Sequence, residues 1–112
     1  MTVNVYEQYF AADGVFSGVR RRGALVMLTA DSDAGNIRYE AAVSFFPHVD
    51  EEDFAVSYDA YFSRVLYEAH GRRSKKREAA LMDQLRGTVD MLAGDAGCAV
   101  LWDVPLLEPR RG

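Results

Sequence analysis

The sequence predicts an α+β fold: a two-layer sandwich with two helices packed on one face of a mainly antiparallel sheet, in the order β-β-β-α-α-β. Residues 37–46 alternate with the period of two that a half-buried strand needs. Apolar residues in 51–70 and in 75–93 recur at the three- and four-residue spacing of amphipathic helices. Because the strand patterns precede the helical patterns instead of alternating with them, we expect an antiparallel sheet.

Two strands are predicted near the start of the chain. Residues 2–11 are rich in β-branched and aromatic side chains, which favour a strand. Some of their apolar residues also share helical spacing, so a short helix stays an alternative there. The letters "ADG" at 12–14 predict a turn into a second strand over 15–22, which Gly18 and Gly23 should bend or bulge.

A hairpin is the clearest prediction. The apolar run 23–30 and the alternating run 37–46 are separated by "DSDAGN", a cluster of turn-forming residues. These six residues also begin like a calcium-binding loop. However, Gly35 and Ala42 stand where that loop needs an oxygen ligand and a bidentate Glu. The segment is therefore interpreted as a turn.

The first predicted helix covers 51–70. Asp50 is a good N-cap, and the acidic residues that follow it oppose the helix dipole favourably. The apolar stripe of this helix should pack on the sheet, and we expect Phe62 to contact the strand that carries Val43.

The second predicted helix covers 75–93 and ends at Gly94. If one straight helix ran through both series, its two apolar stripes would point in nearly opposite directions. Either the chain breaks near 71–74, with Gly71 as the cap of the first helix and Ser74 as the N-cap of the second, or one long helix uses its second face on another subunit. The two cap residues favour the break.

The last apolar run, 98–107, is apolar on both faces and has Pro105 near its end. This pattern favours an inner or strand-pairing segment. We expect residues 1–108 to form one domain and residues 109–112 to form a polar tail.

Basic residues gather in the string "HGRRSKKREA", residues 70–79, which holds five of the thirteen Lys and Arg residues. A solvated junction between two helices explains most of the string, although positive charge in the first turn of a helix opposes its dipole. The alternative is a site that binds phosphate or an acidic partner, together with residues 20–22. Its candidate binding residues are Arg20, Arg22, Arg72, Arg73, Lys75, Lys76 and Arg77.

The bulk properties exclude several classes of protein. The chain has 112 residues and a net charge of −4, which disfavours nucleic acid as a partner of the chain as a whole. No apolar run is long enough to span a bilayer, and the N-terminus lacks the pattern of a signal peptide. Cys98 is the only cysteine, so we expect a reducing, cytoplasmic environment.

No catalytic signature is present. His48 and His70 are the only histidines, and no spacing of Cys and His residues predicts a metal site. A dyad of Cys98 and His48 stays open, but a lone cysteine in an apolar run is usually buried. Helix initiation explains the acidic run 50–53 better than paired carboxylate chemistry does. We expect neither a metal nor another cofactor.

These observations favour a non-catalytic, homodimeric module for protein interaction or regulation. Apolar surface left over at 81–92 and 98–107 predicts the dimer. Two alternatives stay open: binding of nucleic acid or a phosphate ligand through 20–22 and 72–77, and a small-molecule binder or enzyme with a site near His48.

Overall fold

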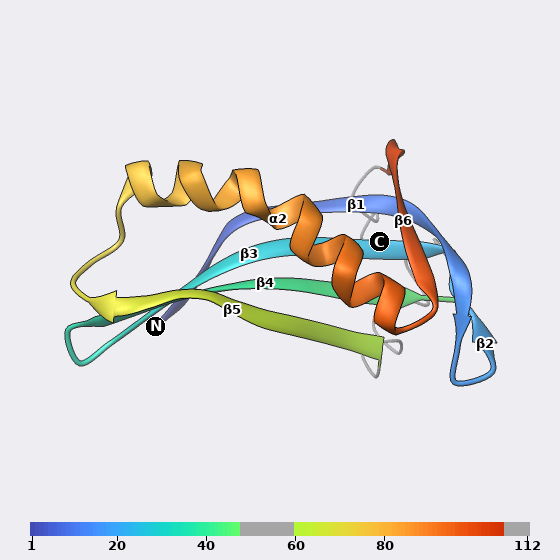
Figure 1. Cartoon of the computed structure of the whole chain (residues 1–112), viewed down its shortest axis with the longest axis horizontal. Helices are drawn as coiled ribbons and strands as arrows, with labels where there is room; N and C mark the ends of the chain where they lie inside the picture. Colours follow the sequence, from blue (N-terminus) through green and yellow to red (C-terminus); the bar gives the residue numbers. More distant parts are fainter. Residues whose placement is uncertain (48–59, 107–112) are drawn as a thin grey trace, which may run out of the picture.

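The computed structural model describes residues 1–47 and 60–106 (Figure 1). Strands make up 62% of these residues. The elements, in chain order, are β1 (Thr2–Phe16), β2 (Val19–Arg20), β3 (Gly23–Asp33), β4 (Asn36–Phe46), β5 (Tyr61–His70), α2 (Lys75–Asp95) and β6 (Cys98–Leu106).

The strands form one antiparallel sheet in the order β2-β1-β3-β4-β5, and β6 also pairs with β1. Tyr9, Phe10 and Ala11 of β1 pair with both β3 and β6, so these two strands lie on opposite sides of β1. As a result, β5 and β6 lie at opposite edges of the sheet, and α2 connects them.

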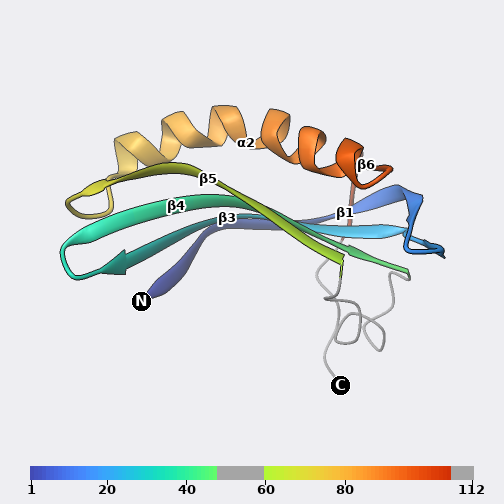
Figure 2. The ribbon, with the colours of Figure 1, turned by 60° about the horizontal axis from the view of Figure 1, so that its bottom comes forward.

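Helix α2 lies across one face of the sheet, here called the inner face (Figure 2). Ser74 is its N-cap, as predicted, and the Ser74 Oγ accepts a hydrogen bond of 3.2 Å from the Arg77 backbone N–H. The buried residues of α2 are Glu78, Leu81, Leu85, Val89 and Ala93. Their spacing of three and four places them in one stripe, which the sequence pattern predicted.

The main core lies between this stripe and the inner face. Every second residue of β3 and of β4 points into it, as the period of a strand requires. The buried strand residues of this core include Ala24, Val26, Leu28, Ala30, Ile37, Tyr39, Ala41, Val43 and Phe45. On the other face, here called the outer face, Leu25 and Phe46 are buried beside Tyr9 and Met27.

The predicted hairpin is confirmed. β3 and β4 pair from Gly23 opposite Phe46 to Asp33 opposite Asn36. The turn between them places Ala34 and Gly35 at positive φ (51° and 81°), as a two-residue hairpin turn of type I′ needs.

The prediction of a turn at 12–14 is wrong. β1 continues through these residues, and the chain turns at Ser17 and Gly18 instead, both at positive φ. Gly14 has a different role, because a Cβ built there would lie 2.6 Å from the Cα of Cys98. Glycine lets β6 approach β1 closely at this point.

The prediction of two helices packed on the sheet is wrong. Residues 61–70, the C-terminal half of the first predicted helix, form the strand β5, and α2 is the single helix of the described residues. Asp50 and residues 51–59 of that predicted helix lie outside the described residues. Gly71 follows a strand, so it is not a helix cap, although its φ of +126° marks the predicted break.

An irregular strand produced the misleading helical pattern. The pairing of β5 with β4 shifts register after Tyr39, so that Leu66 is skipped between Val65 and Tyr67. Phe62 and Leu66 both pack against the main core, four residues apart. Apolar residues on the two faces of a bulged strand therefore reproduced the spacing of a helix. Phe62 does meet Val43, but as a cross-strand partner within the sheet.

Among the described residues, no helix is long and apolar enough to cross a membrane.

The contact between α2 and the sheet can be tested by removing one buried side chain. We expect Leu85→Ala to lower the free energy of unfolding by about 2–5 kcal/mol, because it leaves a cavity in the core. Met91→Ala is a matched control on the same helix, since Met91 is 49% exposed and Leu85 is 3% exposed. Urea denaturation measures both. Equal losses would show that α2 does not pack as described.

Candidate functional site

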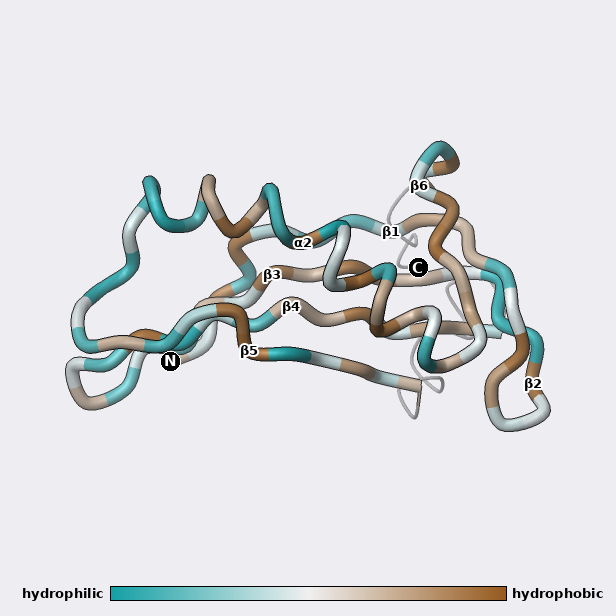
Figure 3. Tube along the Cα trace, in the orientation of Figure 1, coloured by the Kyte–Doolittle hydropathy of each residue, from teal (hydrophilic) through white to brown (hydrophobic). Residues whose placement is uncertain are grey.

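The basic string 70–79 forms the end of β5, the connection to α2 and the first turn of that helix. Hydropathy colouring shows this connection as a hydrophilic stretch (Figure 3). The Gly71 backbone N–H donates to the Gly35 carbonyl (2.8 Å), which holds the start of the connection against the β3–β4 turn. The string is thus a junction, but between a strand and a helix.

Arg73 is engaged inside the protein. Its guanidinium donates two hydrogen bonds to the Glu78 carboxylate, at 2.9 and 3.1 Å. The buried Tyr39 hydroxyl donates to the same carboxylate at 2.7 Å, and the Ser74 backbone N–H donates to that hydroxyl at 3.2 Å. Four groups from β4, the connection and α2 thus form one network, here called the Glu78 network. It holds the N-terminus of α2 on the sheet.

The charge pairing in this network shifts the pKa of both partners. Hydrogen bonds from Arg73 lower the pKa of Glu78, burial opposes this, and the hydrogen bond from Tyr39 adds to the lowering. The carboxylate raises the pKa of Arg73 in turn. Burial is the main cause that raises the pKa of Tyr39, so this phenol stays protonated and remains a donor.

The other basic residues of the string differ in their surroundings. The Arg77 guanidinium lies over the ring of Tyr67, 4.2 Å from its centroid, which is a cation–π contact. Arg72, Lys75 and Lys76 are exposed, and the structure gives them no ion pair with any other residue in 1–47 or 60–106. Of the basic residues in the string, Arg72 and Lys76 remain available to an external anion, whereas the charge of Lys75 also helps to lower the pKa of Glu78.

The residues of the second basic cluster, 20–22, also differ in their surroundings. Arg20 pairs with Asp13 at 2.9 Å in an exposed ion pair. Arg21 is buried, with its guanidinium over the ring of Phe16 and its Nη2 donating to the Phe16 carbonyl at 3.3 Å. Arg22 is exposed and lines a shallow depression with Asp13 and Leu101.

The two basic clusters do not meet. The first turn of α2 lies at one end of the molecule, and the β1–β2 hairpin lies at the other end (Figure 1). A combined phosphate site built from 20–22 and 72–77 is therefore not formed, because the length of the sheet separates its halves. The sequence alone could not place them relative to each other, since β3, β4 and β5 lie between them in the chain.

The enzyme alternative gains no site from the described residues. Cys98 is buried, and burial raises the pKa of its thiol, so it is a poor nucleophile near neutral pH. His48, its proposed partner, and the acidic run 50–53 lie outside the described residues. Within 1–47 and 60–106, no group of His, Cys, Asp and Glu residues is arranged to hold a metal ion.

The outer face carries a charged cluster at the β3–β4 turn. Arg38 lies 3.6 Å from Asp31, 3.7 Å from Glu40 and 4.0 Å from Glu68. Thr2 donates to Asp31 at 2.9 Å, and this hydrogen bond lowers the pKa of the Asp31 carboxyl. Because Arg38 is 45% exposed at its side chain, these ion pairs are screened and contribute little stability.

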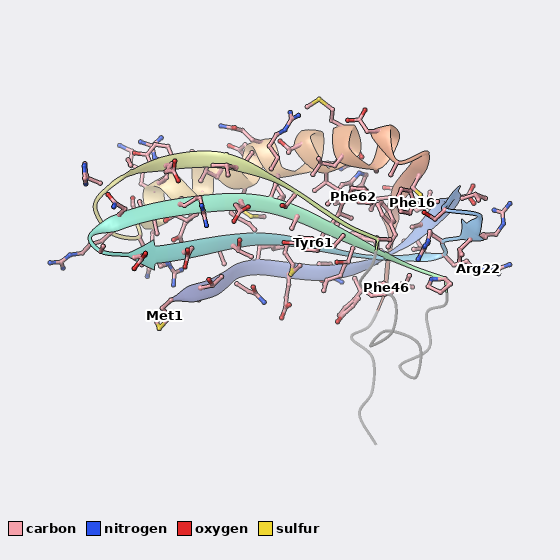
Figure 4. The ribbon with its side chains drawn as sticks, turned by 90° about the horizontal axis from the view of Figure 1, so that it is seen from below. Met1, Phe16, Arg22, Phe46, Tyr61 and Phe62 are labelled. Carbon is pink, nitrogen blue, oxygen red and sulfur yellow. The ribbon has the colours of Figure 1, made fainter. Side chains whose placement is uncertain are left out.

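The outer edge of β5 is a feature that the sequence did not reveal. Within the described residues β5 pairs only with β4. Tyr61 and Val65 are each 47% exposed, among the largest exposures of apolar side chains in this part of the protein. Figure 4, seen from below in the orientation of Figure 1, looks onto this edge. The β-branched and aromatic content of 61–67 was the signal that could have identified the strand.

No protein-family model, curated protein or solved structure matches this chain.

The Glu78 network should make stability depend on acid pH. A carboxyl whose pKa is lower in the folded state stabilises the fold fully above its unfolded pKa, which is 4.5 for Glu. This contribution is lost as the pH falls from there through the lower folded pKa. At neutral pH we expect Glu78→Gln to destabilise the protein by about 1–3 kcal/mol, because hydrogen bonds to a charged group are lost.

The test is how the difference in free energy of unfolding between the parent and Glu78→Gln changes with pH. Urea denaturation from pH 7 to pH 2.5 should show the difference between them shrinking below about pH 4.5, since a protonated Glu78 resembles glutamine. Asp83→Asn, at an exposed position of the same helix, is the control for loss of one negative charge. A difference that stays constant with pH would contradict the charged pairing.

The exposed lysines at the start of α2 allow a test of the phosphate alternative. We expect Lys75→Glu with Lys76→Glu to change the free energy of unfolding by no more than ~0.5 kcal/mol, because a gain from the helix dipole is opposed by loss of the Lys75 charge that helps to lower the pKa of Glu78. Negative charge in the first turn of a helix is favourable there. Heparin binding should be absent from the parent at physiological salt. Salt-sensitive binding that the double variant loses would instead support an anion site.

Proposed function

We propose that this protein is a non-catalytic interaction module that forms a homodimer through the outer edge of β5. The supporting observation is the row of β5 backbone groups without a described partner strand, beside two half-exposed apolar side chains. An unpaired strand edge is a template for pairing with another strand. Proteins that do not use such an edge usually protect it.

The two edges of this sheet differ in that protection. β6 contains Pro105, and its pairing with β1 jumps from Leu101 to Pro105 between adjacent residues of β1. A proline and an irregularity of this size hinder the addition of another strand. β5 contains no proline, and its pairing with β4 is regular from Tyr61 to Val65.

The dimer is thus supported by a different surface from the one that the sequence suggested. Leu81, Leu85 and Val89 are buried against the sheet of the same chain, so the apolar series at 81–92 is not surplus surface. The inner face of the sheet, on which the first predicted helix was expected to pack, is covered by α2 (Figure 2). Leu101 and Val104 of β6 remain exposed, but they lie on the protected edge.

Symmetry favours pairing of β5 with β5. An interface between identical edges closes after two copies, because each edge is then satisfied. Pairing of β5 with β6 of another copy would leave two free edges and could continue into a fibre. The irregular β6 edge with Pro105 opposes that outcome.

The oligomeric state tests the proposal. A short strand pairing buries less surface than a typical stable interface, so we expect a weak dimer with a dissociation constant in the micromolar range. Light scattering at tens of micromolar protein should give a mass near twice the 12.5 kDa of the chain, falling on dilution. A monomer at every concentration would contradict the proposal.

A charge on the edge should separate the copies. Val65→Lys places a lysine at a half-exposed site of β5, so it should give a monomer with little change in stability. Val104→Lys is the matched control, because Val104 is 46% exposed but lies on β6 at the opposite edge of the sheet, and this variant should remain a dimer. If Val65→Lys dimerises like the parent, the interface lies elsewhere.

A further inference from the structure

The regular part of the β5 edge has a self-complementary pattern. Its register places Tyr61 opposite Ser44, Ser63 opposite Ala42 and Val65 opposite Glu40. Phe62 lies between them and packs into the core beside Phe16, with ring centroids 5.2 Å apart (Figure 4). Since side chains alternate along a strand, Tyr61, Ser63 and Val65 share the outer face.

We propose that two copies pair antiparallel along β5 about a two-fold axis at Ser63. Tyr61 of each copy then lies directly opposite Val65 of the partner subunit, and the two Ser63 residues face each other. This inference rests on the proposed function and adds to it the partner, a second copy of this chain, and the register of the contact.

The equal exposure of Tyr61 and Val65 supports this register. Each is 47% exposed, and they lie four residues apart on the same strand. A two-fold axis midway between them, at Ser63, therefore buries both side chains in two identical contacts between Tyr61 and Val65. Directly opposed aromatic and β-branched residues are among the favourable cross-strand pairs. Ser63, between them, is small enough for the two backbones to approach and can form a hydrogen bond across the axis.

The inner face accepts the same register. Phe62 then lies opposite Arg64 of the partner subunit. Arg64 already turns toward α2, where its Nη1 lies 3.8 Å from the Met91 sulfur. A guanidinium beside an aromatic ring is a favourable neighbour, and no like charges oppose each other directly within 61–65.

Other registers lose this complementarity. When two copies pair about a two-fold axis normal to the sheet, residues that lie opposite each other are on the same face. An alternative register must therefore shift the pairing by two residues. Shifting one way sets Tyr61 opposite Ser63 and leaves Val65 outside the regular pairing. Shifting the other way sets Ser63 opposite Val65 and brings Tyr61 against the irregular part of β5 at Leu66 and Tyr67.

Complementary charges test the register. Tyr61→Lys and Val65→Glu should each give a chain that is mainly monomeric, because each removes one member of both apolar pairs. An equimolar mixture of the two should recover a dimer, since one contact becomes an ion pair and the other keeps the parent pair of Tyr61 and Val65. Sedimentation velocity at tens of micromolar protein would measure this recovery. A mixture that stays monomeric while the parent dimerises would overturn the register.

Disulfide formation gives a second measurement. Ser63→Cys places two thiols at the axis, so mild oxidation should yield a covalent dimer that denaturing electrophoresis detects. Glu68→Cys is the control on the same strand and face, because its two copies would lie about 30 Å apart in this register. The parent should not cross-link, since Cys98 is buried.

The outcomes separate the two proposals. A dimeric parent with no Ser63→Cys cross-link overturns the register and leaves the proposed function standing. A parent that is monomeric at every concentration overturns both.

Discussion

The packing of one helix on one face of the sheet is the constraint on which the rest of this structure depends. Leu81, Leu85 and Val89 of α2 cover the central strands, whose buried residues are mostly small or branched apart from Tyr39 and Phe45. Because α2 is the single helix of residues 1–47 and 60–106 and connects β5 to β6, it crosses from one edge of the sheet to the other. That crossing makes β5 and β6 the two edge strands, and it leaves the outer face without a layer from α2 (Figure 2).

The Glu78 network determines where that helix begins. A buried carboxylate is costly unless it is paired, and here Arg73 and Tyr39 satisfy it together. The network explains why a basic residue precedes a helix whose first turn carries further positive charge. Arg73 neutralises the carboxylate that anchors the helix, and Arg77 stacks on Tyr67 of the neighbouring strand. Part of the basic string is therefore structural, which weakens the case for a phosphate site.

The two edge strands, β5 and β6, differ in how regularly they pair with their neighbours. β6 arrives after the tight approach of Gly14 to Cys98, and its irregular pairing and Pro105 oppose further strands. β5 is regular over the residues that carry Tyr61 and Val65, and irregular only beyond them. A symmetric contact on β5 uses the open edge and leaves the protected one as a barrier to continued assembly.

Local chemistry by itself determined the hairpin of 23–46, the Ser74 cap and the apolar stripe of α2. A two-residue turn, a capping hydroxyl and a helical period each act within a few residues, so the sequence displays them directly. Tertiary structure decided the rest. Residues 61–70 have apolar residues at helical spacing, yet they form an edge strand with a bulge at Leu66. Glu78 accepts a hydrogen bond from Tyr39, which is 39 residues away in the chain. The candidate interface at Tyr61 and Val65 exists only because β5 lies outermost, which depends on the pairing order of distant strands.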